Sequence, residues 1–152
     1  MNLFLDANVL FSAAYSAEGN ARALIAAAAE HRLTLAVSAH VLGEARRNLG
    51  AKASQALAAL AAIEALTCLV PPGTPATEAA VRALGIVPKD APVLAAAIDC
   101  AAEVFVTGDA RHFGHLYGQT VLGVRVLGLR AAFEEVAARP PPPPPAQRKR
   151  PG

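Results

Sequence analysis

The stretch Leu3–Asp6, with the sequence LFLD, decides the fold class, because a short apolar run ends directly at an acidic residue. The stretch Val104–Asp109 (VFVTGD) has the same character later in the chain. Both apolar runs predict short buried strands. In open parallel sheets, ligands bind at the edge formed by the C-terminal ends of the strands. Asp6 and Asp109 are therefore expected to lie together at that edge.

Strand and helix patterns alternate along the rest of the chain. Further strands are expected near residues 33–37, 67–70 and 124–127, and helices near 8–15, 21–31, 38–48, 52–65, 90–102 and 129–138, with a short helix ending at 84. Ser38 is a natural N-cap, and Gly50 is expected to end the helix that Ser38 starts. Alternation of this kind predicts an α/β fold, with a mainly parallel sheet and helices on both faces.

The length of 152 residues suggests one domain, which we place at residues 1–139. Residues 140–145 are six consecutive prolines, which predict a polyproline II rod. The basic remainder, to residue 152, is expected to be disordered. Three of the 14 Lys and Arg residues lie in this tail, which leaves 11 against 12 Asp and Glu in residues 1–139. The folded body therefore has no overall basic signature for nucleic acid.

Nothing in the sequence predicts export or membrane insertion. A strand begins almost at the N-terminus, without the basic and apolar regions of a signal peptide. The Ala- and Leu-rich segment 53–66 is too short to span a bilayer. Cys68 and Cys100 lack metal-site spacing and are expected to be buried thiols in a reducing compartment. We expect a cytoplasmic protein that folds alone or as a homo-oligomer.

Two further acids, Glu44 and Asp90, are expected on helices packed beside the same edge of the sheet. Four nearby carboxylates would repel one another, and each would disfavour ionisation of the others. A hard divalent cation such as Mg²⁺, which binds carboxylates and water, would relieve that repulsion. Asp99 lies nine residues after Asp90 on the same helix, which places it on the opposite face and outside the cluster.

Each acid also has a purely structural explanation. Asp6, Asp90 and Asp109 precede helical stretches, where a carboxylate can cap free N–H groups. Pro92 fits only the first turn of a helix, so a helix should begin near Asp90. Glu44 could pair with Arg47. Capping and metal binding are compatible, because a capping carboxylate retains further lone pairs.

Basic side chains near the acids are candidates for holding phosphates. Arg47 follows Glu44 on its helix and Arg111 follows Asp109, whereas Arg46 is expected to pair with an acid or to face solvent. His112 is the only histidine expected close to the acids, where its candidate role is that of a general base. The sequence contains no P-loop, no dinucleotide-binding glycine pattern and no nucleophile elbow.

Four motifs, in order, resemble those of the PIN-domain ribonucleases. They are Leu5–Leu10 (LDANVL), the helical segment Ser38–Leu49 with its glutamate, Asp90–Ala97 (DAPVLAAA) and Val106–Asp109 (VTGD), the last followed by Phe113. The resemblance covers roughly residues 2–130, with spacings typical of small bacterial members. It is strongest to the VapC-like toxin components of toxin–antitoxin modules. Gly43 departs mildly from the pattern, since the family often has a second acid there.

The resemblance implies a three-layer α/β/α fold with a five-stranded parallel sheet. It also implies an Mg²⁺- or Mn²⁺-dependent endoribonuclease, with RNA as substrate and an antitoxin protein as a possible partner. Carried over residue by residue, it assigns the metal site to Asp6, Glu44, Asp90 and Asp109, and supporting roles to Asn8 and Thr107. Two alternatives stay open: a PIN-fold RNA-binding or regulatory module without turnover, and another Mg²⁺-dependent phosphohydrolase.

Overall fold

Strand β1 (Asn2–Leu5) lies inside the sheet, between β2 (Thr34–Ser38) and β4 (Val104–Val106), and is parallel to both. The structure is a computed structural model, and it describes residues 1–146. The apolar side chains of β1 and β4 are fully buried, as expected for parallel strands that are covered on both faces. Leu5 is in register with Val106, so these two strands end side by side.

The sheet of the described chain has the strand order β3-β2-β1-β4-β6-β5, with β3 at Cys68–Val70, β5 at Thr120–Val121 and β6 at Val124–Leu127. Only β5 is antiparallel to its neighbour, so the predicted mainly parallel sheet is confirmed. The expected number of five strands was wrong by one. The extra strand β5 depends on a tight turn in which Leu122 and Gly123 have φ of 47° and 91°. Positive φ at both central residues is typical of a hairpin turn, but Leu at the first position hides the usual sequence signal.

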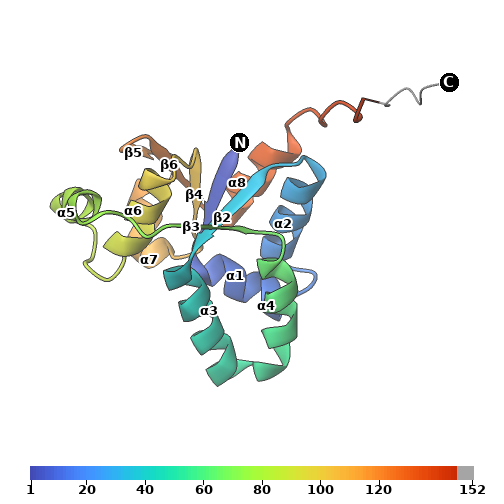
Figure 1. Cartoon of the computed structure of the whole chain (residues 1–152), viewed down its shortest axis with the longest axis horizontal. Helices are drawn as coiled ribbons and strands as arrows, with labels where there is room; N and C mark the ends of the chain where they lie inside the picture. Colours follow the sequence, from blue (N-terminus) through green and yellow to red (C-terminus); the bar gives the residue numbers. More distant parts are fainter. Residues whose placement is uncertain (147–152) are drawn as a thin grey trace.

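Helices cover both faces of the sheet, as predicted (Figure 1). The pair α5 (Pro75–Ala83) and α6 (Ala91–Asp99) packs together on one side. On the other side, α1 packs against α2 and α4, and α2 packs against α8. The bounds of these helices are Ala7–Tyr15, Asn20–Glu30, Leu57–Glu64 and Leu129–Ala137 for α1, α2, α4 and α8. The three-layer α/β/α architecture is confirmed.

Helix α3 (Ala39–Lys52) begins at the predicted cap but runs past its predicted end. The Ser38 hydroxyl accepts a hydrogen bond from the Val41 backbone N–H at 3.4 Å. Gly50 does not stop the helix, and the Ala53 N–H still closes on the Leu49 carbonyl at 2.7 Å. A short 3-10 turn, η1 (Ser54–Ala56), then leads into α4, which begins later than expected. The extra turn of α3 carries Lys52.

Three phenylalanine rings join the central strands to the short helix α7 (Ala110–Phe113), which is followed by the 3-10 turn η2 (Gly114–Leu116). The Phe4 and Phe105 ring centroids lie 6.0 Å apart, and Phe113 meets Phe105 edge-on at 5.2 Å. Phe113 is buried. Aromatic pairs at these separations stabilise beyond their buried area. This packing fixes where the chain turns after β4.

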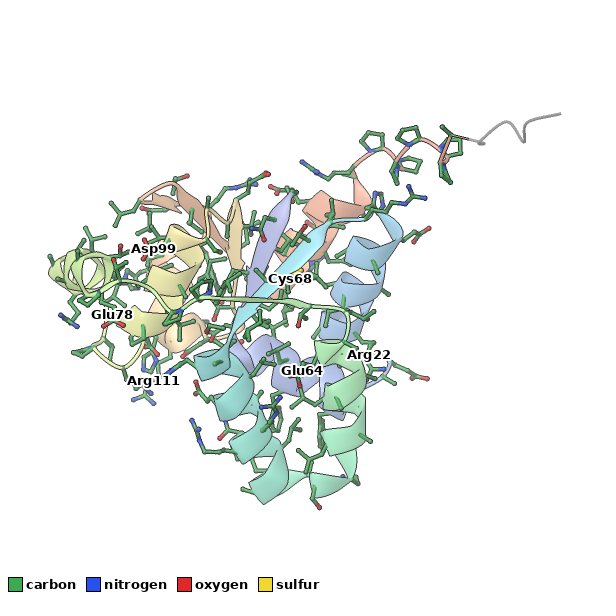
Figure 2. All side chains as sticks on the ribbon, viewed as in Figure 1. Arg22, Glu64, Cys68, Glu78, Asp99 and Arg111 are labelled. Atoms are coloured by element: carbon green, nitrogen blue, oxygen red, sulfur yellow. The ribbon has the colours of Figure 1, made fainter. Side chains whose placement is uncertain are left out.

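The prediction that both thiols are buried was wrong for Cys68, which is exposed, whereas Cys100 is half-buried. Cys68 lies on β3, one of the two edge strands of the described sheet, which has only one neighbouring strand (Figure 2). An apolar run therefore predicted a strand correctly but not its place at the edge of the sheet.

The first residues of the proline tail lie far from the C-terminal edge of β1 and near its N-terminal end (Figure 1). Pro140 and Pro142 line a hollow with His31 and Leu33. Residues 140–146 form no helix or strand. The rest of the predicted disordered basic tail, residues 147–152, lies outside the described residues. Within residues 1–146, no helix is long and apolar enough to cross a membrane.

Candidate active site

Asp6 follows β1 directly, and its backbone joins it to β4. The Asp6 N–H donates to the Val106 carbonyl at 3.0 Å, which extends the β1–β4 ladder by one step. Thr107, Gly108 and Asp109 continue the chain from the end of β4. The C-terminal edge of the sheet therefore brings Asp6 beside the 107–109 turn, as the two strand patterns predicted.

The Asp6 carboxylate is held by three donors. Its Oδ2 accepts from the Thr107 hydroxyl at 2.8 Å and from the Asn8 side-chain amide at 3.1 Å. Its Oδ1 accepts from the Ala7 N–H at 2.7 Å, which caps α1. Burial raises the pKa of the Asp6 carboxyl above its ordinary value, and Glu44 raises it further, while these hydrogen bonds oppose the rise. Burial, rather than the repulsion expected from sequence, is the largest cause.

Asn8 and Thr107 also hold the turn that carries Asp109. The Asn8 side-chain oxygen accepts from the Gly108 N–H at 2.7 Å, and the Thr107 hydroxyl accepts from the Asp109 N–H at 3.1 Å. The Tyr117 hydroxyl donates to the Thr107 carbonyl at 3.0 Å. Asn8 and Thr107 therefore contact both Asp6 and the turn before Asp109. Tyr117 was not predicted, because it reaches the site from a loop with no local motif.

Asp109 and Asp90 converge on one imidazole. The Oδ2 atoms of Asp109 and Asp90 lie 2.9 Å and 3.0 Å from His112 Nδ1. The second oxygen of Asp109 caps α7 by accepting from the His112 backbone N–H at 3.1 Å. Asp90 begins α6, as Pro92 predicted, but its side chain makes no capping bond. The ligand atoms of these three residues lie within 4.8 Å of one another, the one such group in the part of the chain that the structure describes.

The surroundings of Asp90 disfavour the charged form of its carboxyl group. Burial raises the pKa of its carboxyl above the ordinary value, and the negative charges of Asp109 and Glu44 act in the same direction. His112 and Lys89 oppose the rise but do not cancel it. Within this arrangement, Asp90 Oδ2 and His112 Nδ1 are both buried and have no hydrogen-bond partner, since their close contact lacks the direction of a hydrogen bond.

All four predicted acids line one cleft of about 350 Å³ at the C-terminal edge of the sheet. Asp6 follows β1, Asp109 follows β4, Asp90 starts α6 and Glu44 comes from α3. The other residues that line the cleft are Ala7, Asn8, Phe11, Ser12, Asn48, Lys52, Lys89 and Val93. Residues distant in sequence thus form one concave, acid-rich surface.

Asp99 lies on the other side of α6, as predicted from its spacing. Its carboxylate accepts from the Thr74 N–H and the Thr77 hydroxyl, each at 2.7 Å. Figure 2 shows Asp99 beside α5, near Glu78. These hydrogen bonds lower the pKa of the Asp99 carboxyl, which is the opposite of the shift at Asp90.

The basic residues that line the cleft are not the ones that were predicted. Arg46 pairs with Glu64 at 2.6 Å, which agrees with its expected structural role. Arg47 and Arg111 are exposed and do not line the cleft, although Arg111 lies on α7 only two residues after Asp109 (Figure 2). The cations that line the cleft are Lys52 and Lys89, which sequence reasoning missed. Lys52 reaches the cleft because α3 is longer than expected. Lys89 lies in the turn directly before Asp90.

The donor set of the cleft fits a divalent cation. Carboxylate oxygens are the ligands that Mg²⁺ and Mn²⁺ take, and imidazole nitrogen is a ligand for transition metals. Two buried polar atoms, Asp90 Oδ2 and His112 Nδ1, lack a partner that an ion would supply. The Asp6 oxygens are already engaged by three donors, which fixes the direction of their remaining lone pairs.

Comparison with known proteins identifies the fold and the family of the chain. The chain is similar over 84% of its length to a chain in the crystal structure of VapBC2 from Rickettsia felis bound to a DNA fragment from their promoter, with 98% of that chain covered. The TM-score is 0.63 and the sequence identity 16%, so this likeness shows the fold alone. No curated protein matches the chain. The sequence model described as PIN domain matches residues 2–111, which is more than half of the chain. The chain therefore belongs to the PIN domain family.

Proposed function

We propose that this protein is a divalent-metal-dependent endoribonuclease. The observation that carries the proposal is the convergence of Asp6, Glu44, Asp90 and Asp109 in one cleft from four different elements. A site of this charge repels a phosphodiester unless a cation is bound. PIN domains are typically nucleases, and the four motifs that resemble PIN ribonucleases supply all four acids.

The four acids would hold Mg²⁺ or Mn²⁺. When bound there, such an ion would supply a water molecule of lowered pKa and would stabilise negative charge on the phosphate. Asn8 and Thr107 keep the Asp6 carboxylate in one orientation and fix the turn before Asp109. Side chains that are pinned before substrate arrives need no reorganisation during the reaction.

Cations at the cleft would hold the RNA backbone. Lys52 and Lys89 line the cleft and can neutralise phosphates that flank the scissile bond. Arg47 and Arg111 are exposed just outside it and would extend the contact along the strand. The folded body has no overall basic surface, so RNA binding would depend on this local set.

We further propose that the protein acts as the toxin of a toxin–antitoxin module, in the cytoplasm and as a homo-oligomer. The resemblance to VapC-like toxins, and the fold shared with one chain of the VapBC2 crystal structure, support a cognate antitoxin partner. Co-purification with the product of an adjacent small gene, and loss of RNA cleavage in that complex, would test this role.

The nuclease proposal is tested by incubating the full chain with end-labelled RNA in Mg²⁺ or Mn²⁺, with and without excess EDTA. Internal cleavage that EDTA abolishes and added metal restores is the expected result. Cleavage that persists in EDTA would overturn the metal requirement. RNA binding without cleavage would favour the regulatory module, and turnover of a small phosphate ester but not RNA would favour a phosphohydrolase.

A further inference from the structure

The contacts of the His112 side chain indicate a ligand in addition to the four acids. We propose that His112 Nδ1 is a direct ligand of the bound ion, together with Asp90 and Asp109, and that this nitrogen makes the site prefer Mn²⁺ to Mg²⁺. The inference rests on the proposed function only in taking the cleft to be a divalent metal site.

The first support is the spacing of the three ligand atoms. In an octahedral complex with ion–ligand distances of about 2.0–2.1 Å, two neighbouring ligand atoms are about 3 Å apart. His112 Nδ1 lies 2.9 Å from Asp109 Oδ2 and 3.0 Å from Asp90 Oδ2. Both separations therefore match the edge of a coordination octahedron.

The second support is that these short contacts are not hydrogen bonds. Nδ1 meets two carboxylate oxygens without the direction that a ring N–H would need for either. His112 Nδ1 and Asp90 Oδ2 are both buried and have no hydrogen-bond partner, although they lie at ion-pair distance from each other when the imidazole is protonated. A buried polar atom left without a partner costs free energy, and an ion in contact with both atoms would remove that cost.

The third support is the way α7 is built. Asp109 caps α7 through the His112 backbone N–H, and Phe113 anchors the helix in the core against Phe105. The backbone position of His112 is thus set by contacts that do not involve its imidazole. The ring starts from this fixed backbone and lies beside Asp90 and Asp109, two of the four acids of the cleft.

Nitrogen ligation would change which ion is favoured. Mg²⁺ is a hard ion that takes oxygen ligands and retains several waters, whereas imidazole suits transition metals. Mn²⁺ accepts both oxygen and nitrogen. A site of two carboxylates and one imidazole should therefore bind Mn²⁺ more tightly than Mg²⁺, and the imidazole should account for much of the difference.

The test is Mn²⁺ electron paramagnetic resonance on the intact full-length protein. Loss of the free Mn²⁺ signal on titration gives Kd, and pulsed measurements detect nitrogen bound to the ion. We expect a nitrogen coupling that changes when the histidines are labelled with ¹⁵N. In His112→Ala the coupling should vanish and the Mn²⁺ Kd should rise about 10–100-fold. Competition with Mg²⁺ should show a smaller rise in the Mg²⁺ Kd.

His115→Ala is the matched control, because His115 is exposed and lies one turn further along the same segment. It should keep both the coupling and the affinity. The Asp109 cap uses the His112 backbone N–H, so His112→Ala retains that bond, and circular dichroism checks the fold. If the variant fails to fold, the labelled wild-type protein still decides the matter.

The outcomes separate this inference from the nuclease proposal. Bound Mn²⁺ without coupling to a histidine nitrogen overturns it, even if RNA is cleaved. Absence of Mn²⁺ binding also overturns it. Histidine coupling in a protein that cleaves no RNA supports the ligand assignment and rejects the nuclease.

Discussion

The Thr107 hydroxyl is predicted to hold the candidate site together, and Thr107→Val removes it with little change in shape. The side chain is fully buried. Its oxygen donates to Asp6 Oδ2 at 2.8 Å and accepts from the Asp109 N–H at 3.1 Å, while its contact with the Asn8 amide is long, at 3.4 Å. The substitution therefore loosens two of the four acids at once.

The expected cost follows from these contacts. A hydrogen bond to a charged group contributes about 1.5–3 kcal/mol and a neutral one about 0.5–1.5 kcal/mol. The long contact adds little, so Thr107→Val should lower the free energy of unfolding by about 2–4 kcal/mol. For a domain of this size that corresponds to a drop in Tm of roughly 5–15 °C.

Thermal melting in EDTA at pH 7 measures this effect, and Thr107→Ser is the matched control. Serine keeps the hydroxyl and loses one buried methyl group, which costs about 1 kcal/mol. RNA cleavage by the valine variant should also fall, because Asp6 would no longer be fixed. If Thr107→Val proves as stable as Thr107→Ser, the hydroxyl does not hold the acids and the reasoning is refuted.

Three other predictions concern the carboxylates on α6, the two exposed arginines and the C-terminal tail. The raised pKa of Asp90 means that the folded state binds its proton more tightly than the unfolded state, so stability falls as pH climbs above the unfolded value near ~4. Without metal, the Tm of Asp90→Asn should therefore be higher than that of wild type at pH 7, and this difference should disappear in acid. The Tm of Asp99→Asn should be lower than that of wild type at pH 7, because hydrogen bonds depress the pKa of Asp99. Charge removal at Arg47 or Arg111 should weaken RNA binding, which fluorescence anisotropy measures. The slope of log Kd against log salt concentration should become shallower by about 0.7 for each phosphate contact that is lost. An unchanged slope would show that the residue does not touch RNA. Deleting residues 140–152 should leave the rate of cleavage of a short oligonucleotide nearly unchanged, because the tail begins near the N-terminal ends of the strands. Loss of cleavage in a folded protein would contradict this.

Asp6 does not share the stability prediction made for Asp90, although burial raises the pKa of both carboxyls. The Asp6 oxygens accept hydrogen bonds from three donors on both sides of the group. An asparagine amide would present N–H groups to one of those sides. Asp6→Asn therefore loses favourable contacts as well as an unfavourable charge.

The parts of the site predicted from sequence are those set by local patterns. An acid that ends a buried strand must lie at the C-terminal edge, so Asp6 and Asp109 could be placed together. Pro92 fixed the start of α6 at Asp90, and helical spacing put Asp99 on the other face. The fold class followed from the same alternation of strands and helices.

The parts that sequence reasoning missed depend on contacts between distant elements. His112 was expected near the acids, but its contact with Asp90 was not, because that contact depends on how α7, anchored by Phe113, packs beside the start of α6. Lys52 reaches the cleft because α3 continues past Gly50. Strand β5 is two residues long and turns at a leucine with positive φ, so neither periodicity nor turn composition reveals it.

The nuclease proposal can be tested directly by comparing the two aspartates at the ends of α6. Asp90 and Asp99 lie at the two ends of α6, one lining the acid cleft and the other bound to Thr74 and Thr77 away from it. Single-turnover RNA cleavage in Mn²⁺ should be measured for Asp90→Asn and Asp99→Asn, with the fold checked by circular dichroism. We predict that Asp90→Asn loses at least a hundredfold in rate, or about 2.7 kcal/mol of transition-state stabilisation, while Asp99→Asn cleaves within a few fold of wild type. Equal rates for the two variants would show that the acid cleft is not where RNA is cleaved.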